Sequence, residues 1–145
     1  MRSDQKKAAL NGLTGPFAKF LNIEVKEVRD GWAQLCMKIE KKHTHHRGAV
    51  QGGLVITLAD AALAIALKTV IEPTNETATV ETKINFIRPG SGTKLRAQAK
   101  VRHQGKRFLV GDMTVLNDED KVVAIGMGTF VILDTNTEQR TSNWV

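Results

Sequence analysis

The sequence is poor in residues that build disulfide scaffolds or stacking surfaces. It contains one cysteine, Cys36, so no internal disulfide can form, and this favours a reducing compartment. Aromatic residues make up 5% of the chain and tyrosine is absent, so few rings are available to stack on nucleic-acid bases. No basic stretch is interleaved with aromatic rings either. We therefore expect that the protein does not bind nucleic acid.

Long apolar runs are also missing. The longest, Gly53 to Leu67, is interrupted by Asp60 and is shorter than the roughly 20 residues that a membrane-spanning helix requires. The segment from Met1 to Lys7 is charged, but no apolar signal core follows it. We expect a soluble, cytoplasmic protein that does not enter a membrane.

The remaining composition is that of one ordinary domain. The chain has 145 residues, enough for a single core, and no shift in composition divides it. Its net charge of +6 favours anionic partners such as nucleotide phosphates. Within this single domain, residues 1–22 are expected to form short amphipathic helices broken at Gly15-Pro16. Residues 134–145 are expected to form a polar, loosely held tail.

The hydrophobic pattern predicts an α+β fold. Strands are expected at 23–29, 32–40, 77–87, 94–103, 107–116 and 121–133, with turn signals between them. A polar loop at 41–51 leads into residues 53–70, which are apolar on nearly every face, as a fully buried helix requires. An antiparallel sheet curled around this helix accounts for the order of the elements. The small residues Ala124, Gly126 and Gly128 share a strand face, where we expect the helix to approach closely.

Asp60 is the one ionisable side chain between Gly53 and Leu67. Burying an unpaired carboxylate costs several kcal/mol, so its presence there requires a compensating reason. The structural explanation is a bond to a nearby hydroxyl such as that of Thr57, or exposure where the helix leaves the sheet. The functional explanation is a reacting carboxylate.

A glycine pair, Gly52 and Gly53, stands where this helix begins. It either forms a plain tight turn or leaves unpaired N–H groups at a helix N-terminus, which stabilise an anion. Eight residues of helix separate Gly52 from Asp60, a rise of roughly 12 Å at about 1.5 Å per residue. Both can act on one carbonyl group only if two helices lie antiparallel across a two-fold axis. Catalysis would then require a dimer.

The segments HHRGAVQGGLVITLADAALAIA and TVETKINFIRPG resemble the phenylacetate-pathway (PaaI-like) branch of the hotdog thioesterases. The resemblance extends from about Asn22 to Leu133 and includes the glycine pair, the later aspartate and the Asn-Phe-x-Arg-Pro strand end. It implies a hotdog fold, in which a curled antiparallel sheet wraps around a long central helix. It also implies hydrolysis of acyl-CoA thioesters without a cofactor, at active sites formed in a homodimer interface. We expect such dimers to pair into tetramers.

The resemblance also suggests roles for single residues. Gly52 matches the position of the oxyanion-hole amide, Asp60 that of the catalytic nucleophile or general base, and Thr79 that of a hydroxyl that orients water. At two positions this chain departs from the family pattern. Gln51 replaces the usual histidine and can form hydrogen bonds but cannot titrate. His45 stands where asparagine or glutamine is common, and an imidazole, unlike an amide, can carry a charge.

Basic residues offer contacts for the phosphates of CoA. The candidate substrate-binding residues are Gly53, Arg88, Arg102, Lys106 and Arg107. The alternative is that these charges only solvate one face of the sheet. His43, His45 and His46 resemble a metal-binding cluster, but the sequence has no second ligand group, so we expect a polar loop and no metal.

We therefore expect an acyl-CoA thioesterase. The departures at His45 and Gln51 motivate an alternative, a non-catalytic module that binds acyl-CoA in the same groove. A structural or nucleic-acid-binding protein is the third possibility, and strongly salt-dependent binding to DNA or RNA would support it.

Overall fold

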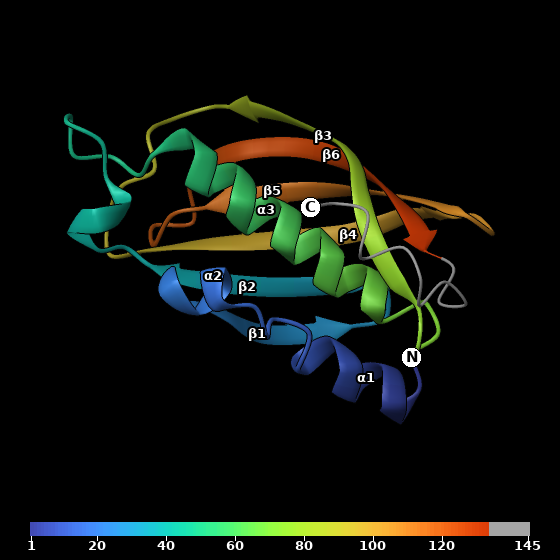
Figure 1. Cartoon of the computed structure of the whole chain (residues 1–145). Helices are drawn as coiled ribbons and strands as arrows, with labels where there is room; N and C mark the ends of the chain where they lie inside the picture. Colours follow the sequence, from blue (N-terminus) through green and yellow to red (C-terminus); the bar gives the residue numbers. More distant parts are fainter. Residues whose placement is uncertain (134–145) are drawn as a thin grey trace, which may run out of the picture.

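A long helix lies inside a curved antiparallel sheet in the computed structural model of the chain, which describes residues 1–133 (Figure 1). The N-terminal elements are α1 (Ser3–Leu10), α2 (Pro16–Phe20), β1 (Ile23–Arg29) and β2 (Trp32–Lys38). A 3-10 turn, η1 (Lys41–His43), and the long helix α3 (Gly52–Lys68) follow. The remaining strands are β3 (Glu76–Phe86), β4 (Lys94–Gln104), β5 (Phe108–Leu116) and β6 (Val122–Leu133). The expected tail, residues 134–145, lies outside the described residues.

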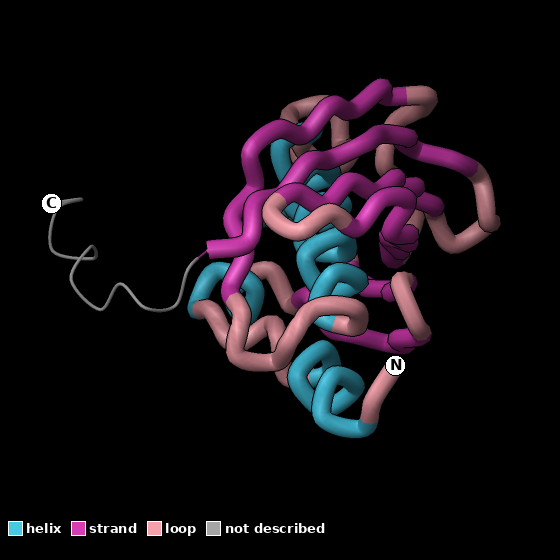
Figure 2. Tube along the Cα trace, turned by 90° about the vertical axis from the view of Figure 1, so that its right-hand side faces the viewer, coloured by secondary structure: helices cyan, strands magenta, loops and turns pink. Residues whose placement is uncertain are grey.

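The six strands form one sheet in the order β1-β2-β4-β5-β6-β3, and every neighbouring pair is antiparallel. After β2 the chain forms α3, returns at the far edge as β3 and then crosses back to β4 beside β2. The view in Figure 2 shows the strands curving around α3. The α+β architecture expected from the sequence is confirmed, and β1 and β3 are the two edges of the sheet.

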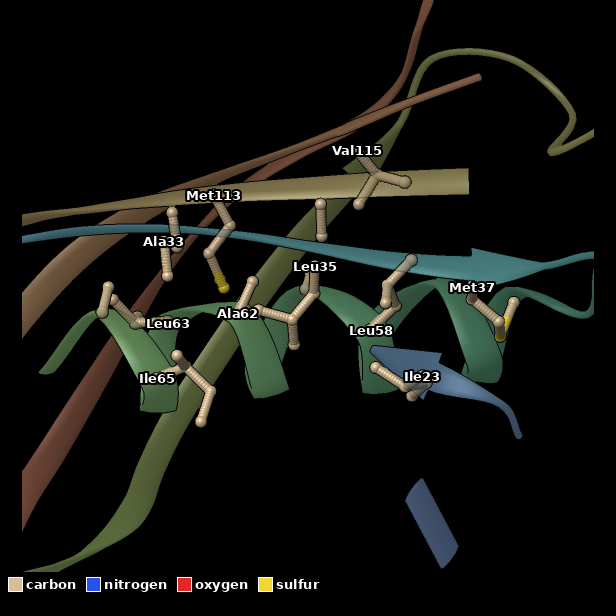
Figure 3. Packing of buried hydrophobic residues seen from close by; sticks show 14 of the residues in the cluster. Ile23, Ala33, Leu35, Met37, Leu58, Ala62, Leu63, Ile65, Met113 and Val115 are labelled. Atoms are coloured by element: carbon tan, nitrogen blue, oxygen red, sulfur yellow. The ribbon is translucent and has the colours of Figure 1, made fainter. Parts of the chain in front are cut away.

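The core lies between α3 and the concave face of the sheet. Helix α3 forms because its 17 residues are rich in alanine and leucine and contain no proline. Its inner face carries Leu58, Ala62 and Leu63, which are fully buried. They pack with inward-facing side chains of the strands, including Leu35 of β2 and Met113 of β5 (Figure 3). The alternation of buried and exposed residues along β2, β4 and β5 produces this face.

Two glycines of the sheet make room for the central helix. Gly111 of β5 and Gly128 of β6 are partners in the strand register. A Cβ atom at either position would contact the side chain of Leu63, at 2.9 Å for Gly128. The expected approach of the helix is therefore confirmed at Gly128. It was wrong for Gly126, where an added Cβ would meet the backbone carbonyl of Lys83 in the neighbouring strand β3.

One flank of α3 remains open, so the expectation of a fully buried helix was wrong for the single chain. Residues at helical spacing along this flank are half-buried or exposed: Gly53, Ile56, Thr57, Asp60, Ala61, Ala64 and Lys68. The physical reason is that one curved sheet covers only one side of a helix. The open flank lies between the two edge strands, β1 and β3, and carries the aspartate.

The N-terminal region forms the two short helices expected around Gly15-Pro16. Gly15 is the N-cap of α2 and Pro16 occupies its first turn, where a missing N–H group costs nothing. Leu21, at the end of α2, is buried and anchors this segment to the core. None of the helices in residues 1–133 is long and apolar enough to cross a membrane.

Candidate active site

Asp60 lies near the middle of α3, on its open flank, and is half-buried. The hydroxyl of Thr79 donates to the carboxylate, with Oγ1 at 3.1 Å from both Oδ1 and Oδ2. The hydroxyl of Thr82 donates to Oδ1 at 2.9 Å. Both threonines come from β3, so the helix and the edge strand together fix the orientation of this carboxylate.

A β-bulge explains how both threonines reach the same carboxylate. In a regular strand, residues three positions apart point to opposite faces. In β3 the register with β6 shifts between Thr79 and Glu81, which leaves Val80 as an extra residue. The bulge therefore turns Thr79 and Thr82 toward the same side. Strict alternation would place Thr82 on the opposite face, and Thr82 was not among the expected site residues.

The carboxylate opens into a cavity of about 460 Å³. Asp60, Thr79 and Thr82 line it from α3 and β3, and apolar side chains from α2, β1 and α3 complete the wall. Thr57 also lines it, but its hydroxyl donates to the carbonyl of Gly53 at 2.9 Å within the helix. The alternative in which Thr57 satisfies Asp60 is therefore not what the structure shows. The polar partners of Asp60 come from another element and face a cavity.

Gly52 and His45 line a second cavity, of about 350 Å³. Gly52 begins α3, and in the described part of the chain neither its N–H nor that of Gly53 has a hydrogen-bond acceptor. The ring of Phe86 covers Gly52, because a Cβ added there would lie 3.3 Å from the ring. An unpaired N–H group at a helix N-terminus is a donor for an anion.

His45 belongs to a tight loop between η1 and α3. The loop is closed by a bridge between Thr44 and Val50 and by a bond from the His45 N–H to the Ala49 carbonyl. Nδ1 of His45 accepts the N–H of Arg47 at 3.0 Å. Its Nε2 atom is therefore the ring nitrogen left for a bound molecule.

Gln51 is the N-cap of α3, but it acts through its backbone. Its carbonyl accepts the N–H groups of Leu54 and Val55, and its own N–H donates to His43. The side chain is exposed and has no hydrogen-bond partner within residues 1–133. Gln51 is therefore free to point toward a molecule bound at the start of the helix.

The predicted catalytic residues thus fall into two groups on one chain. Asp60 and Thr79 share the first cavity, and Gly52 and His45 share the second. The rise of the helix places Gly52 roughly 12 Å from Asp60 along α3. This separation is the one expected from the sequence, and one chain does not bring both groups to a single carbonyl.

The basic residues are not gathered at one place either. Arg88 lines the second cavity, and its guanidinium donates to the carbonyl of Val122. Arg102, Lys106 and Arg107 lie around the opposite end of β4, which has 11 residues and is therefore roughly 35 Å long. Arg102 forms an ion pair with Asp112 there, so Arg88 alone of this set joins the candidate site in one chain.

The histidines of the loop differ in how deeply they are buried. His43 is 1% exposed, and its Nδ1 accepts the N–H of Glu40 at 3.0 Å. His45 and His46 lie with their ring centroids 5.7 Å apart. In the part of the chain that the structure describes, no three His, Cys, Asp or Glu side chains form a group that could hold a metal ion.

Known proteins share both sequence and fold with this chain. The family model of the thioesterase superfamily matches residues 47–124. The acyl-coenzyme A thioesterase PaaI of Escherichia coli is 35% identical over 112 residues, 77% of this chain and 78% of that protein. A putative esterase of Saccharolobus solfataricus is 29% identical over 86% of this chain and 83% of that protein.

Solved structures superpose over almost the whole chain. The structure of the E. coli PaaI protein, from the phenylacetic acid degradation operon, matches with a TM-score of 0.79 and 27% identity. The superposition covers 90% of this chain and 96% of that one. The BH2602 protein of Bacillus halodurans, solved with CoA, matches with a TM-score of 0.79 and 28% identity, over 91% of this chain and 93% of that one.

Proposed function

The chain belongs to the thioesterase superfamily, as a PaaI-like member with the hotdog fold, and we propose that it hydrolyses acyl-CoA with Asp60 as the reacting carboxylate. Two of its relatives are named for the hydrolysis of CoA thioesters, the acyl-coenzyme A thioesterase PaaI and 1,4-dihydroxy-2-naphthoyl-CoA hydrolase. The chain is accordingly a thioester hydrolase. We propose that Asp60, together with residues of a second chain, performs the reaction.

One observation carries the assignment of Asp60. Among residues 1–133 it is the only charged side chain that lines the first cavity, and two hydroxyls from a neighbouring strand hold it there. A carboxylate fixed at the wall of a cavity that is otherwise lined by apolar side chains and threonines is placed to react with a bound group. The bonds from Thr79 and Thr82 alone would also suit a structural aspartate, and the position of the carboxylate at the cavity is what favours the functional explanation.

Two routes of hydrolysis are open to this carboxylate. As a general base, Asp60 takes a proton from water while the water oxygen bonds to the thioester carbon. As a nucleophile, it bonds to that carbon itself and forms an anhydride, which water then cleaves. On either route the carbon–sulfur bond breaks, CoA leaves as the thiol after taking up a proton, and the acyl group becomes a carboxylic acid. Thr79 and Thr82 hold the oxygen atoms of Asp60 in one orientation for this step.

The carbonyl oxygen gains negative charge in both routes and needs a donor. We propose that the N–H of Gly52 from a second copy supplies it, because the Gly52 of the same chain lies too far along the helix. Support comes from the surface around Asp60. The outer edge of β3 has no strand partner within residues 1–133, and Ile56, Val80 and Phe86 expose 36%, 57% and 53% of their surface.

An antiparallel pair of chains accounts for these exposed groups together. The edge of β3 would pair with the same edge of the partner, and the open flanks of the two α3 helices would face each other. Each helix N-terminus, with His45 and Gln51 beside it, would then lie near the Asp60 of the other chain. The side of the sheet away from α3 exposes Phe108, Ile125 and Met127, which favours further pairing of such dimers.

CoA would enter over the N-terminus of α3, where Gly53 leaves open space and Arg88 provides a positive charge. Arg102, Lys106 and Arg107 remain a prediction, because they lie at the far end of β4 from Arg88. Phosphate contacts from that end would have to come from another chain or from a bent CoA.

The direct test is a panel of acyl-CoA substrates with detection of the released thiol, applied to wild type and to Asp60→Asn. We expect wild type to release CoA and the variant to lose at least about 10³-fold in kcat/KM, because the amide is neither base nor nucleophile. The dimer should persist, since asparagine still accepts from Thr79 and Thr82. A protein that binds acyl-CoA saturably without releasing CoA would support the non-catalytic alternative instead.

A further inference from the structure

The first cavity is lined by one aromatic residue, Phe17, which has no part in the proposed reaction at Asp60. Phe17, in the five-residue helix α2, lines the same cavity as Asp60. The ring is 56% exposed and is not part of the hydrophobic core. A large apolar side chain left this open at a cavity is available to contact a bound molecule. Its role therefore lies at the cavity.

The neighbouring ring of Phe20 provides a contrast within the same helix. It is 60% exposed, but the ammonium group of Lys42 lies 4.6 Å from its ring centre, and Phe20 does not line the cavity. Within residues 1–133 no cation or aromatic ring is paired with Phe17 in this way. The side chain of Phe17 therefore lines the cavity and is free to contact a bound molecule.

The position of Phe17 is fixed by its surroundings in the chain. Gly15 and Pro16 begin the helix, and the N–H of Leu21 donates to the carbonyl of Phe17 at 3.0 Å. Leu21 is buried, and the next strand, β1, starts two residues later. The segment that carries the ring is thus tied to β1, one edge of the sheet, while Thr79 and Thr82 belong to β3, the other edge. The cavity lies between them.

The chemistry of the wall restricts what can occupy the cavity. Phe17, Ala18, Ile23, Ile56 and Ala61 are apolar, and none of the described residues that line the cavity is cationic. Apolar acyl groups gain free energy by leaving water against such a wall. A second carboxylate on the acyl chain would lose its hydration with no cation to compensate, and it would face the charge of Asp60.

We propose that Phe17 is a specificity-determining residue that selects acyl groups with an uncharged, apolar end beyond the thioester carbonyl. This inference rests on the proposed function, because it places the carbonyl at Asp60. The acyl chain then extends along the wall that α2 provides. Acyl groups long enough to reach the ring gain from it, and an acetyl group does not.

Steady-state kinetics with four thioesters test the inference. The probes are acetyl-CoA, hexanoyl-CoA, benzoyl-CoA and glutaryl-CoA, the last similar in length to hexanoyl but ending in a carboxylate. For wild type we expect kcat/KM for hexanoyl-CoA to exceed that for glutaryl-CoA at least about tenfold. Phe17→Ala should lower kcat/KM for hexanoyl-CoA and benzoyl-CoA about tenfold, mainly through KM, and leave acetyl-CoA unchanged within about twofold.

Two further variants make the result specific. Phe20→Ala removes the neighbouring exposed ring and should leave the order of the four substrates unchanged. Phe17→Leu keeps an apolar side chain and should recover part of the loss for hexanoyl-CoA. Equal losses for all four substrates in Phe17→Ala, or no loss at all, would overturn the inference while leaving Asp60-dependent hydrolysis intact. A wild type that hydrolyses none of the four would overturn the proposed function, and the inference with it.

Discussion

Thr82 donates a hydrogen bond of 2.9 Å to the carboxylate of Asp60 from a position that regular strand geometry would turn away from it. The bulge at Val80 makes this contact possible, because it places Thr82 on the same side as Thr79. Bulges often re-aim side chains next to functional sites. The irregularity of β3 is therefore part of how the carboxylate of Asp60 is oriented.

Removing the hydroxyl of Thr82 should lower activity without unfolding the protein. Thr82→Val leaves Asp60 with the single donor Thr79, and hydrogen bonds to a charged group contribute about 1.5–3 kcal/mol. We expect kcat to fall at least about tenfold, measured by thiol release under saturating substrate, and the double variant with Thr79→Val to fall further. Thr57→Val is the matched control, since that hydroxyl bonds to Gly53 within the helix. If Thr82→Val retains wild-type kcat, the bulge has no part in catalysis.

The proposed role of the Gly52 amide can be tested with a variant that lacks its N–H group. Gly52→Pro removes the N–H, and proline is well tolerated at the first position of a helix. Gln51, the preceding residue, has φ −54° and ψ 131°, which suits a residue before proline. We expect kcat to fall about 10²–10³-fold, the usual loss for an oxyanion donor.

Gly52→Ala keeps the N–H and is the control for added bulk beside Phe86, whose ring would lie 3.3 Å from the new Cβ. Its kcat should stay much closer to wild type than that of Gly52→Pro. Equal losses in the two variants would mean that space at Gly52, and not its donor, matters.

The contact between Gly128 and Leu63 should limit which residues the sheet tolerates. Gly128→Ala puts a Cβ at 2.9 Å from Leu63, which is fully buried and cannot move freely. Overpacking of this kind costs about 1–3 kcal/mol of unfolding free energy, measurable by urea denaturation at fixed protein concentration. Adding Leu63→Val should recover part of the loss. Gly53→Ala, where nothing lies within 4 Å of the new Cβ, should not destabilise the protein.

The contact between Thr93 and Asp118 should give the free energy of unfolding a defined pH dependence. The N–H and hydroxyl of Thr93 donate to Asp118 at 2.9 and 2.8 Å, and these bonds, the backbone one first, hold the pKa of Asp118 below its ordinary value. The stabilisation is therefore complete above the ordinary pKa of about 3.9 and is lost as the pH falls through the lowered value.

Asp118→Ala should consequently lower the Tm at about pH 6, and the difference from wild type should shrink toward about pH 2.5. Scanning calorimetry over this range measures it. A Tm difference that stays constant down to the lowest pH would show that the carboxylate charge is not what stabilises the turn.

The sequence predicted the elements well because the signals were local. Alternation along β4 and the turn at Asp30-Gly31 each depend on near neighbours, and the structure places these elements within a few residues of the prediction. Asp60 was recognisable because one carboxylate interrupts an apolar helix. The resemblance suggested that Thr79 orients water, and in the structure its hydroxyl donates to Asp60.

The rest depends on tertiary relationships that no local pattern contains. The bulge at Val80 reverses the face of Thr82, and the sequence has no signal for it. Phe17 and Leu21 are both large and apolar, yet Leu21 is buried and Phe17 lines the cavity, which only the tertiary structure reveals. Because α3 is apolar on nearly all sides, the sequence predicted complete burial. In the single chain, however, the sheet covers only one side of the helix.

The central claim is that each active site combines Asp60 of one chain with Gly52 of another. The most direct test is to co-express Asp60→Asn and Gly52→Pro chains with different affinity tags and to purify the mixed dimer. Each variant alone should be nearly inactive, whereas the mixed dimer contains one intact pair and should recover about half of the wild-type kcat per dimer. A mixed dimer no more active than its two parents would contradict the account.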